Sequence, residues 1–165
     1  MTMKTVGALL LFLAALLLFA ASPARAAEFT VTSNADSGEG TLRQAIDAAN
    51  ANAEADTITF NLLEGERKIT LKGQVEIRSS QPLTIDGAEE VTLSGGNTNR
   101  ILFVNNSTLT LRALTLTDGN DGGFDSGGAI FSNAGSTLTV EGSTFSQNSA
   151  TFFGGAIRNN GTMTV

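Results

Sequence analysis

A short acidic segment supplies the best candidate metal ligands in the sequence. It reads Asp118-Gly-Asn-Asp-Gly-Gly-Phe-Asp125, so three carboxylates and one amide fall within a Gly-rich stretch. Oxygen ligands of this kind suit Ca²⁺. An EF-hand loop beginning at Asp118 would place Gly122 at position 5 and Ala129 at position 12, so that motif fails. We therefore favour a solvated turn, and the alternative is a Ca²⁺ site formed by Asp118, Asp121 and Asp125.

Carboxylates are also the main groups left for acid–base catalysis. The chain has no His, Cys, Trp or Tyr, which excludes a Ser-His-Asp triad, a thiol nucleophile and a zinc finger. We expect the outward-facing acidic residues to fall at different phases of the repeat described below, and no Asp-Asp or Gly-His-Gly signature is present. These residues are Asp86, Asp118, Asp121, Asp125 and Glu141. Convergence on one cleft is what such catalysis requires, so the sequence predicts a protein that is not an enzyme.

The overall composition narrows the classes of partner and fold. Asp and Glu outnumber Lys and Arg by 16 to 10, which gives a net charge of −6, and no basic cluster is present. This balance argues against a nucleic-acid partner. The absence of Cys excludes a disulfide framework. A chain rich in Thr, Gly, Asn and Ser, with spaced apolar residues, indicates an all-β protein with many turns.

Short apolar-Thr-apolar pieces recur from Asp56 onward and indicate the strands. Each piece places two residues on one side and a Thr on the other. Gly, Asn, Asp or Ser separates nearly all of them, as tight turns require. Strands this short do not suit an ordinary two-sheet sandwich, but they suit a coiled solenoid. The pieces are Ile58–Phe60, Ile69–Leu71, Leu83–Ile85, Val91–Leu93, Leu109–Leu111, Leu114–Leu116, Leu138–Val140 and Met163–Val165.

A longer period connects these pieces. The tetrapeptide Gly127-Gly128-Ala129-Ile130 recurs as Gly154-Gly155-Ala156-Ile157, at an offset of 27 residues. Neighbouring segments repeat at similar offsets, which predicts one turn of a parallel β-helix per repeat. Inward residues of successive turns then form columns, which are Leu102/Ile130/Ile157, Leu109/Leu138/Met163 and Leu116/Phe145. The same alignment places Asn105, Asn133 and Asn160 at one turn, where their amides are expected to form an asparagine ladder.

One amphipathic helix precedes the repeats. Thr41-Leu-Arg-Gln44 has the spacing of a capping box, and an apolar stripe follows at i, i+3, i+4 and i+7, formed by Leu42, Ala45, Ile46 and Ala49. The end of a solenoid leaves unpaired backbone and an open core. We expect this short helix to cap the first turn.

The N-terminal residues have the layout of a secretory signal peptide. Lys4 is followed by an apolar run over Val6–Ala21 and then by the small-x-small site Ala24-Arg25-Ala26. A membrane anchor is the alternative, but the run is shorter than the ~20 residues of a spanning helix. The expected organisation is a signal peptide over 1–26, an N-terminal strand and capping helix over 27–55, and β-helix turns over 56–165. We expect the array to be truncated at its C-terminus, because it stops inside a turn.

The repeated motifs resemble those of a known family. The two Gly-Gly-Ala-Ile copies, with Phe131-Ser-Asn133 and Phe145-Ser-Gln-Asn148 between them, are similar to the GGA[I/V/L] and FxxN repeats of bacterial polymorphic outer membrane proteins. The segment from Phe29 to Ile46 resembles the opening of secreted bacterial right-handed parallel β-helix proteins. This resemblance implies a right-handed parallel β-helix and an autotransporter-like surface protein.

These observations lead to one functional expectation and two alternatives. We expect an exported adhesin-like passenger, extracellular or at the cell outer membrane, that binds extracellular polysaccharide or a host or matrix protein without a cofactor. Outer-membrane association would come from a missing C-terminal region. The first alternative is a polysaccharide-active, pectate lyase-like β-helix enzyme or its inactive fragment, and the second is a structural spacer. Three Phe residues in Gly-rich loops, Phe124, Phe152 and Phe153, either form exposed anchors or fold back over the turns.

Overall fold

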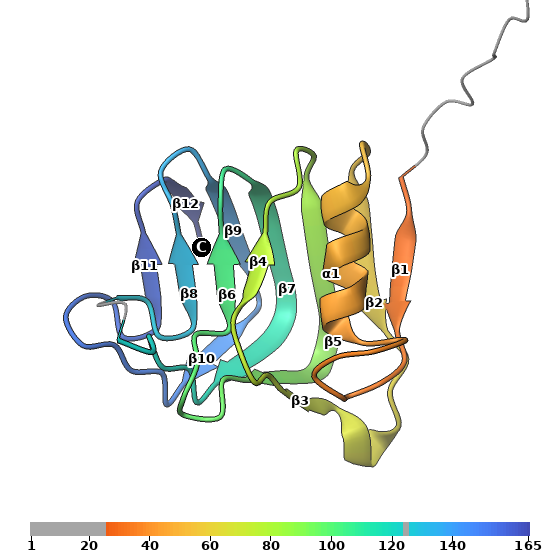
Figure 1. Cartoon of the computed structure of the whole chain (residues 1–165), viewed down its shortest axis with the longest axis horizontal. Coiled ribbons are helices and arrows are strands. Elements are labelled where there is room, and N and C mark those ends of the chain that lie inside the picture. The colour runs from red at the N-terminus through yellow and green to blue at the C-terminus, as the bar shows by residue number, and fades with distance from the viewer. Residues whose placement is uncertain (1–25, 124–125) are drawn as a thin grey trace, which may run out of the picture.

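The chain is a parallel β-helix built from two facing sheets. A computed structural model describes residues 26–123 and 126–165 (Figure 1). All the strand pairs between successive turns are parallel. The predicted all-β solenoid is therefore confirmed. Residues 1–25 of the predicted signal peptide lie outside the described residues.

The strands divide between an eight-stranded and a four-stranded sheet. The eight-stranded sheet contains β1 (Glu28–Val31), β2 (Asp56–Phe60), β3 (Lys68–Thr70), β5 (Leu83–Ser94), β7 (Thr108–Thr117), β9 (Thr137–Glu141), β10 (Thr144–Ser146) and β12 (Thr162–Thr164). The four-stranded sheet contains β4 (Val75–Ile77), β6 (Leu102–Val104), β8 (Ile130–Ser132) and β11 (Ile157–Asn159). In Figure 1 the four-stranded sheet lies in front, and the larger sheet lies behind it.

The hydrophobic core fills the space between the two sheets. Leu109 faces Leu138, which faces Met163, in three successive strands of the larger sheet. Leu102, Ile130 and Ile157 form the corresponding column in the smaller sheet. Leu116 likewise faces Phe145. The columns predicted from the repeat offsets are confirmed, because parallel strands one turn apart place equivalent side chains next to each other.

Two strands are longer than the sequence pattern predicts. Leu83–Ile85 and Val91–Leu93 are the two arms of β5, and the two Leu-Thr-Leu pieces of the next turn are the arms of β7. Each strand bends at residues with positive φ, which are Ala88 and Glu89 in β5 and Ala113 in β7. One turn later, Gly142 takes the same conformation between β9 and β10. The prediction of separate three-residue strands is wrong here, because the strand continues through each corner. The arms on either side of the β5 corner pair with the corresponding arms of β7, with a register shift between Asp86 and Val91.

The predicted helix is confirmed as α1 (Leu42–Ala51). The hydroxyl of Thr41 accepts a hydrogen bond from the Gln44 N–H at its N-terminus, and Leu42, Ala45, Ile46 and Ala49 are buried. The helix lies beside β4 at the edge of the four-stranded sheet (Figure 1). A 3₁₀ turn, Glu64–Glu66, connects β2 to β3. In the described part of the chain, no helix has the length and apolar character needed to cross a membrane.

Candidate binding surfaces

The carboxylates of the acidic segment contact different turns of the β-helix. Asp118 Oδ2 accepts hydrogen bonds from Ser94 Oγ at 3.0 Å and from Lys68 Nζ at 3.3 Å, both in preceding turns. Asp121 Oδ2 accepts from the backbone N–H of Thr151 at 2.8 Å, in the next turn. Each carboxylate therefore already has a partner within the fold. Asp125 lies outside the described residues, so the three-carboxylate Ca²⁺ hypothesis stays a prediction.

Burial and hydrogen bonds set the ionisation of these two groups. The hydrogen bond from the Thr151 N–H lowers the pKa of Asp121, and further bonds from Gly123 and from the Thr151 hydroxyl act in the same direction. Burial acts to raise the pKa of Asp118, but hydrogen bonds from Ser94 and Lys68 outweigh it and lower that pKa. Asp121 is only 2% exposed. The expectation of a solvated turn is therefore wrong for Asp121, whose carboxylate links two turns.

The repeated Gly-Gly-Ala-Ile motif forms a stacked corner. Gly127 and Gly154 have positive φ, and a Cβ at either position would collide with a carbonyl oxygen three residues ahead. The N–H of Gly128 donates to Gly155 O at 2.9 Å, and Ala129 pairs with Ala156 in the same way. Small residues are required here because successive backbones approach closely. The motif thus allows successive turns to stack at this corner without a steric collision.

The Phe-x-x-Asn motif also has a structural role. Phe145 packs against the core next to Leu116 of the preceding turn. Asn148 Oδ1 accepts from the N–H of Gly119 at 2.8 Å, and its Nδ2 donates to Leu116 O at 2.9 Å. The asparagine therefore satisfies two backbone groups of the previous turn, at the last residues of β7 and just after that strand. Both repeat motifs hold the turns in register.

The three aligned asparagines have different partners. Asn133 Nδ2 donates to Asn105 Oδ1 at 3.3 Å, and Asn105 Nδ2 donates to a carboxylate oxygen of Glu76 at 3.0 Å. Asn160 Oδ1 instead accepts from Arg158 Nε at 3.2 Å. The structure thus brings Asn105 and Asn133 together, and Asn105 also contacts Glu76. The Asn160 side chain instead contacts Arg158, two residues earlier in the chain.

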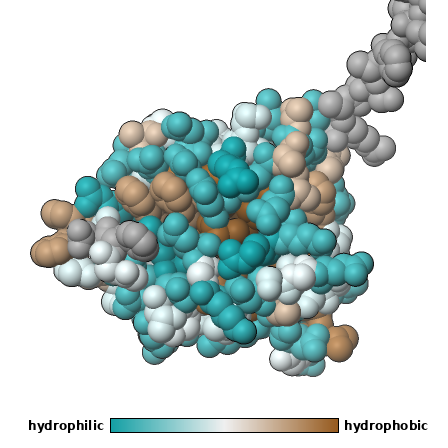
Figure 2. Space-filling view, in the orientation of Figure 1, coloured by the Kyte–Doolittle hydropathy of each residue, from teal (hydrophilic) through white to brown (hydrophobic). Residues whose placement is uncertain are grey.

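An aromatic surface lies on the outer side of the four-stranded sheet. Phe103 and Phe131 occupy equivalent positions in β6 and β8, and their rings stack with centroids 5.6 Å apart. Arg158 follows in the same column, and its guanidinium lies 4.7 Å from the ring centroid of Phe153. We call Phe103, Phe131, Phe153 and Arg158 the aromatic face. Brown atoms over β6 and β8 and at the outer loop mark apolar surface on this side in Figure 2.

The aromatic face is partly accessible, because Phe153 is exposed while Phe103 and Phe131 are half-buried. Phe152 and Phe153 are 70% and 62% exposed, so the expectation that they fold back over the turns is wrong for this pair. Phe124 lies outside the described residues. A shallow pocket of about 320 Å³ beside the stacked rings is lined by Gln74, Arg100, Phe103 and Phe131. This surface was not predicted from the sequence, although the offset of 28 between Phe103 and Phe131 matches the repeat.

Three charged residues form a column on the larger sheet. This alignment contradicts the expectation that the outward acidic residues all fall at different phases of the repeat. Asp86, Arg112 and Glu141 are register partners in β5, β7 and β9. Arg112 Nε lies 2.9 Å from a carboxylate oxygen of Glu141, and an Arg112 terminal nitrogen lies 3.8 Å from Asp86. Asp86 and Glu141 therefore share one phase of the repeat, and the view that these acids fall at different phases is wrong. Their offsets from Arg112, 26 and 29 residues, already carried that signal.

Comparison with known proteins adds to the motif analysis. Residues 142–160 match the Chlamydia polymorphic membrane protein (Chlamydia_PMP) repeat. The matched segment contains both Phe145–Asn148 and Gly154–Ile157, so the predicted resemblance to polymorphic outer membrane protein repeats is confirmed there. No curated protein and no solved structure matches the chain. The chain is thus a parallel β-helix that carries a segment similar to the repeat of these membrane proteins.

Proposed function

We propose that this protein is an exported β-helix that attaches, without catalysis, to extracellular polysaccharide or to a host or matrix protein. The observation that carries the proposal is the aromatic face, where Phe103, Phe131 and Phe153 present apolar rings on an outer surface of the fold. Partly exposed aromatic side chains beside an arginine are typical of sites that contribute strongly to binding. Strands β6 and β8 hold Phe103 and Phe131 in the sheet, so these two residues lose little backbone conformational entropy on binding.

Two observations support a location outside the cell. The N-terminal sequence has the charged start, apolar run and small-x-small site of a secretory signal peptide. The repeat over 142–160 is similar to one named for membrane proteins of Chlamydia. We therefore place the protein at the cell outer membrane or in the extracellular space, with any anchoring supplied by a segment beyond the β-helix.

The ion pairs and hydrogen bonds made by the acidic side chains favour attachment over catalysis. Asp118 is paired with Lys68, and Asp86 and Glu141 both pair with Arg112. Asp121 is occupied by the backbone of the next turn. A general acid needs a raised pKa, whereas hydrogen bonding lowers the pKa of Asp118 and Asp121. These contacts favour a structural role for the carboxylates.

A surface-binding assay tests the proposal. The purified protein without residues 1–26 is applied to immobilised cell surfaces and matrix proteins, next to a Phe131→Ser/Phe153→Ser variant. We expect the variant to lose at least about tenfold in affinity. Leu63→Ser is the matched control, because Leu63 is 74% exposed and lies outside the aromatic face. Equal attachment of all three proteins, or release of sugar products from a polysaccharide, would contradict the proposal.

A further inference from the structure

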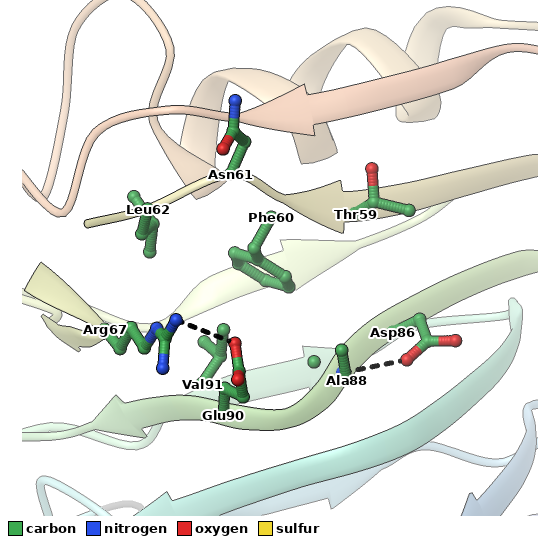
Figure 3. A pocket seen from close by; sticks show the side chains of 10 residues that line it. Thr59, Phe60, Asn61, Leu62, Arg67, Asp86, Ala88, Glu90 and Val91 are labelled. Atoms are coloured by element: carbon green, nitrogen blue, oxygen red, sulfur yellow. Dashed lines mark hydrogen bonds and ion pairs between the residues drawn. The ribbon is translucent and has the colours of Figure 1, made fainter. Parts of the chain in front are cut away.

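A second pocket opens at the corner of β5 in the eight-stranded sheet, whereas the aromatic face belongs to the four-stranded sheet. It has a volume of about 330 Å³, within the range of small-molecule sites. Figure 3 shows the end of β2 on one side of it and the corner of β5 on the other. Its lining includes Phe60, Arg67, Asp86, Gly87, Ala88 and Glu90.

The pocket exists because one turn of the β-helix lacks a corner. β2 pairs with the first arm of β5, and β3 pairs with the second arm. Between β2 and β3 the chain leaves the sheet through the 3₁₀ turn Glu64–Glu66, so no strand covers the bend of β5 on this side. On the other side, Leu114 of β7 lies directly against Gly87. The bend of β5 is therefore covered by the next turn on one side and open on the side of β2 and β3.

The lining combines an aromatic ring with paired polar groups. Phe60 is half-buried, and its ring lies between the end of β2 and the β5 corner (Figure 3). Arg67 and Glu90 form an ion pair at 3.1 Å along one wall. Asp86 Oδ1 accepts from the Ala88 N–H at 3.0 Å. Carboxylate and guanidinium groups supply hydrogen-bond acceptors and donors for neighbouring hydroxyls, and the ring supplies an apolar contact.

The charges of the lining select among possible ligands. Asp86 and Glu90 contribute two carboxylates to the lining and Arg67 contributes one guanidinium, in a protein whose net charge is −6. Glu90 pairs with Arg67, and Asp86 pairs with Arg112 outside the pocket. An anionic ligand would meet like charge both at the pocket and over the whole surface. A compact neutral ligand with several hydroxyls and an apolar face fits this chemistry. A hexose ring has these properties.

We propose that the β5 corner pocket binds a neutral hexose unit of an extracellular glycan. Phe60 contacts the apolar face of the sugar ring, and the Arg67–Glu90 pair and Asp86 bind its hydroxyls. This inference rests on the proposed attachment function for its biological setting and names the glycan as a ligand. It uses a site distinct from the aromatic face, so the two proposals fail independently.

A titration with free sugars tests the inference without any cell surface. The protein lacking residues 1–26 is titrated with glucose, galactose, mannose and N-acetylglucosamine, and with glucuronate and galacturonate, while backbone amide signals are followed by NMR. We expect at least one neutral sugar to give saturable shifts at residues 59–62 and 86–91, with a dissociation constant on the order of 1 mM. The uronates should bind at least about tenfold more weakly.

Variants assign the binding to the pocket. Arg67→Ala removes the guanidinium, and Phe60→Leu shortens the apolar contact; each should weaken binding at least about tenfold. Arg78→Ala is the matched control, because Arg78 pairs with Glu76 on the other sheet and does not line the pocket. Its affinity should stay within twofold of the parent. Absence of saturable shifts for every neutral sugar, tighter binding of uronates, or equal weakening by Arg78→Ala would overturn the inference, whatever the result of the attachment assay.

Discussion

Single side chains in β9 alternate between the core and the outer surface. Leu138 is fully buried between its register partners Leu109 and Met163. The next residue, Thr139, is half-buried and faces outward between Thr110 and Thr164. A charge introduced at position 138 would therefore lie in the apolar core, whereas a charge at position 139 would lie on the outer surface.

Leu138→Asp should lower the free energy of unfolding by roughly 3–5 kcal/mol, because the carboxylate would lie in an apolar column without a partner. Thr139→Asp should change it by less than about 1 kcal/mol. Urea denaturation followed by circular dichroism measures both. Equal destabilisation by the two substitutions would show that the assignment of inner and outer residues is incorrect.

The buried carboxylate of Asp121 makes stability depend on pH. Its pKa in the folded protein is lowered by the hydrogen bond from Thr151, relative to about 3.9 in an unfolded chain. A carboxylate with a lowered folded-state pKa stabilises the protein above its unfolded pKa, and this stabilisation is lost as the pH falls through the folded-state value. Protonation of Asp121 in acid should therefore weaken the hydrogen bonds that join its turn to Thr151 of the next turn.

Asp121→Asn tests this dependence. The wild-type protein should be more stable than the variant at pH 7, and the difference should shrink as the pH falls below about 4. Urea midpoints at pH 7 and pH 3 give the comparison, with Asp47→Asn as a control at an exposed helix position. A difference that stays constant between the two pH values would argue against an ionised Asp121 as the link.

At the scale of elements, α1 takes the place of a strand beside β4. Asn50 Nδ2 donates to Glu76 O at 2.9 Å, and Asn50 Oδ1 accepts from the Arg78 N–H at 2.8 Å. Arg43 donates to the carbonyl oxygens of Gly73 and Gln74 just before the same strand. These side chains satisfy backbone groups of β4 that would otherwise form an open sheet edge.

Removing the Asn50 amide should therefore expose this edge. Asn50→Ala is expected to lower the free energy of unfolding by about 1–2 kcal/mol and to speed hydrogen exchange at the Arg78 amide. Asp47→Ala, on the exposed side of the same helix, should leave that exchange unchanged. Unaltered exchange at Arg78 in Asn50→Ala would mean that the helix does not protect the edge.

Repeat offsets and apolar patterning were enough to predict the solenoid, its columns and its helix. The bends were not predictable, because Ala88 and Ala113 adopt positive φ although alanine gives no signal for it; only Gly142 marks the equivalent bend. The burial of Asp121 depends on Thr151 in the next turn. The β5 corner pocket arises from the loop between β2 and β3, whose path the repeat pattern does not specify.

At the scale of the whole molecule, both proposed binding surfaces depend on one property. The aromatic face requires β6, β8 and β11 to be in register. The corner pocket requires β2 and β3 to pair with the two arms of β5. Residues about one repeat apart must therefore be neighbours, at the 4.7–4.9 Å spacing of adjacent strands.

Disulfide formation between engineered cysteines tests this register most directly, because the chain has no cysteine of its own. Thr110 and Thr139 are register partners on the outer surface of adjacent strands, whereas Thr110 and Thr164 lie two strands apart. Adjacent positions fall within the Cα separation that a disulfide spans, and positions two strands apart, at about 9.6 Å, do not. Under mild oxidation, Thr110→Cys/Thr139→Cys should form an intramolecular disulfide, detected by mass spectrometry, and Thr110→Cys/Thr164→Cys should not. A disulfide in the second variant but not in the first, or equal yields in both, would contradict the stacked β-helix.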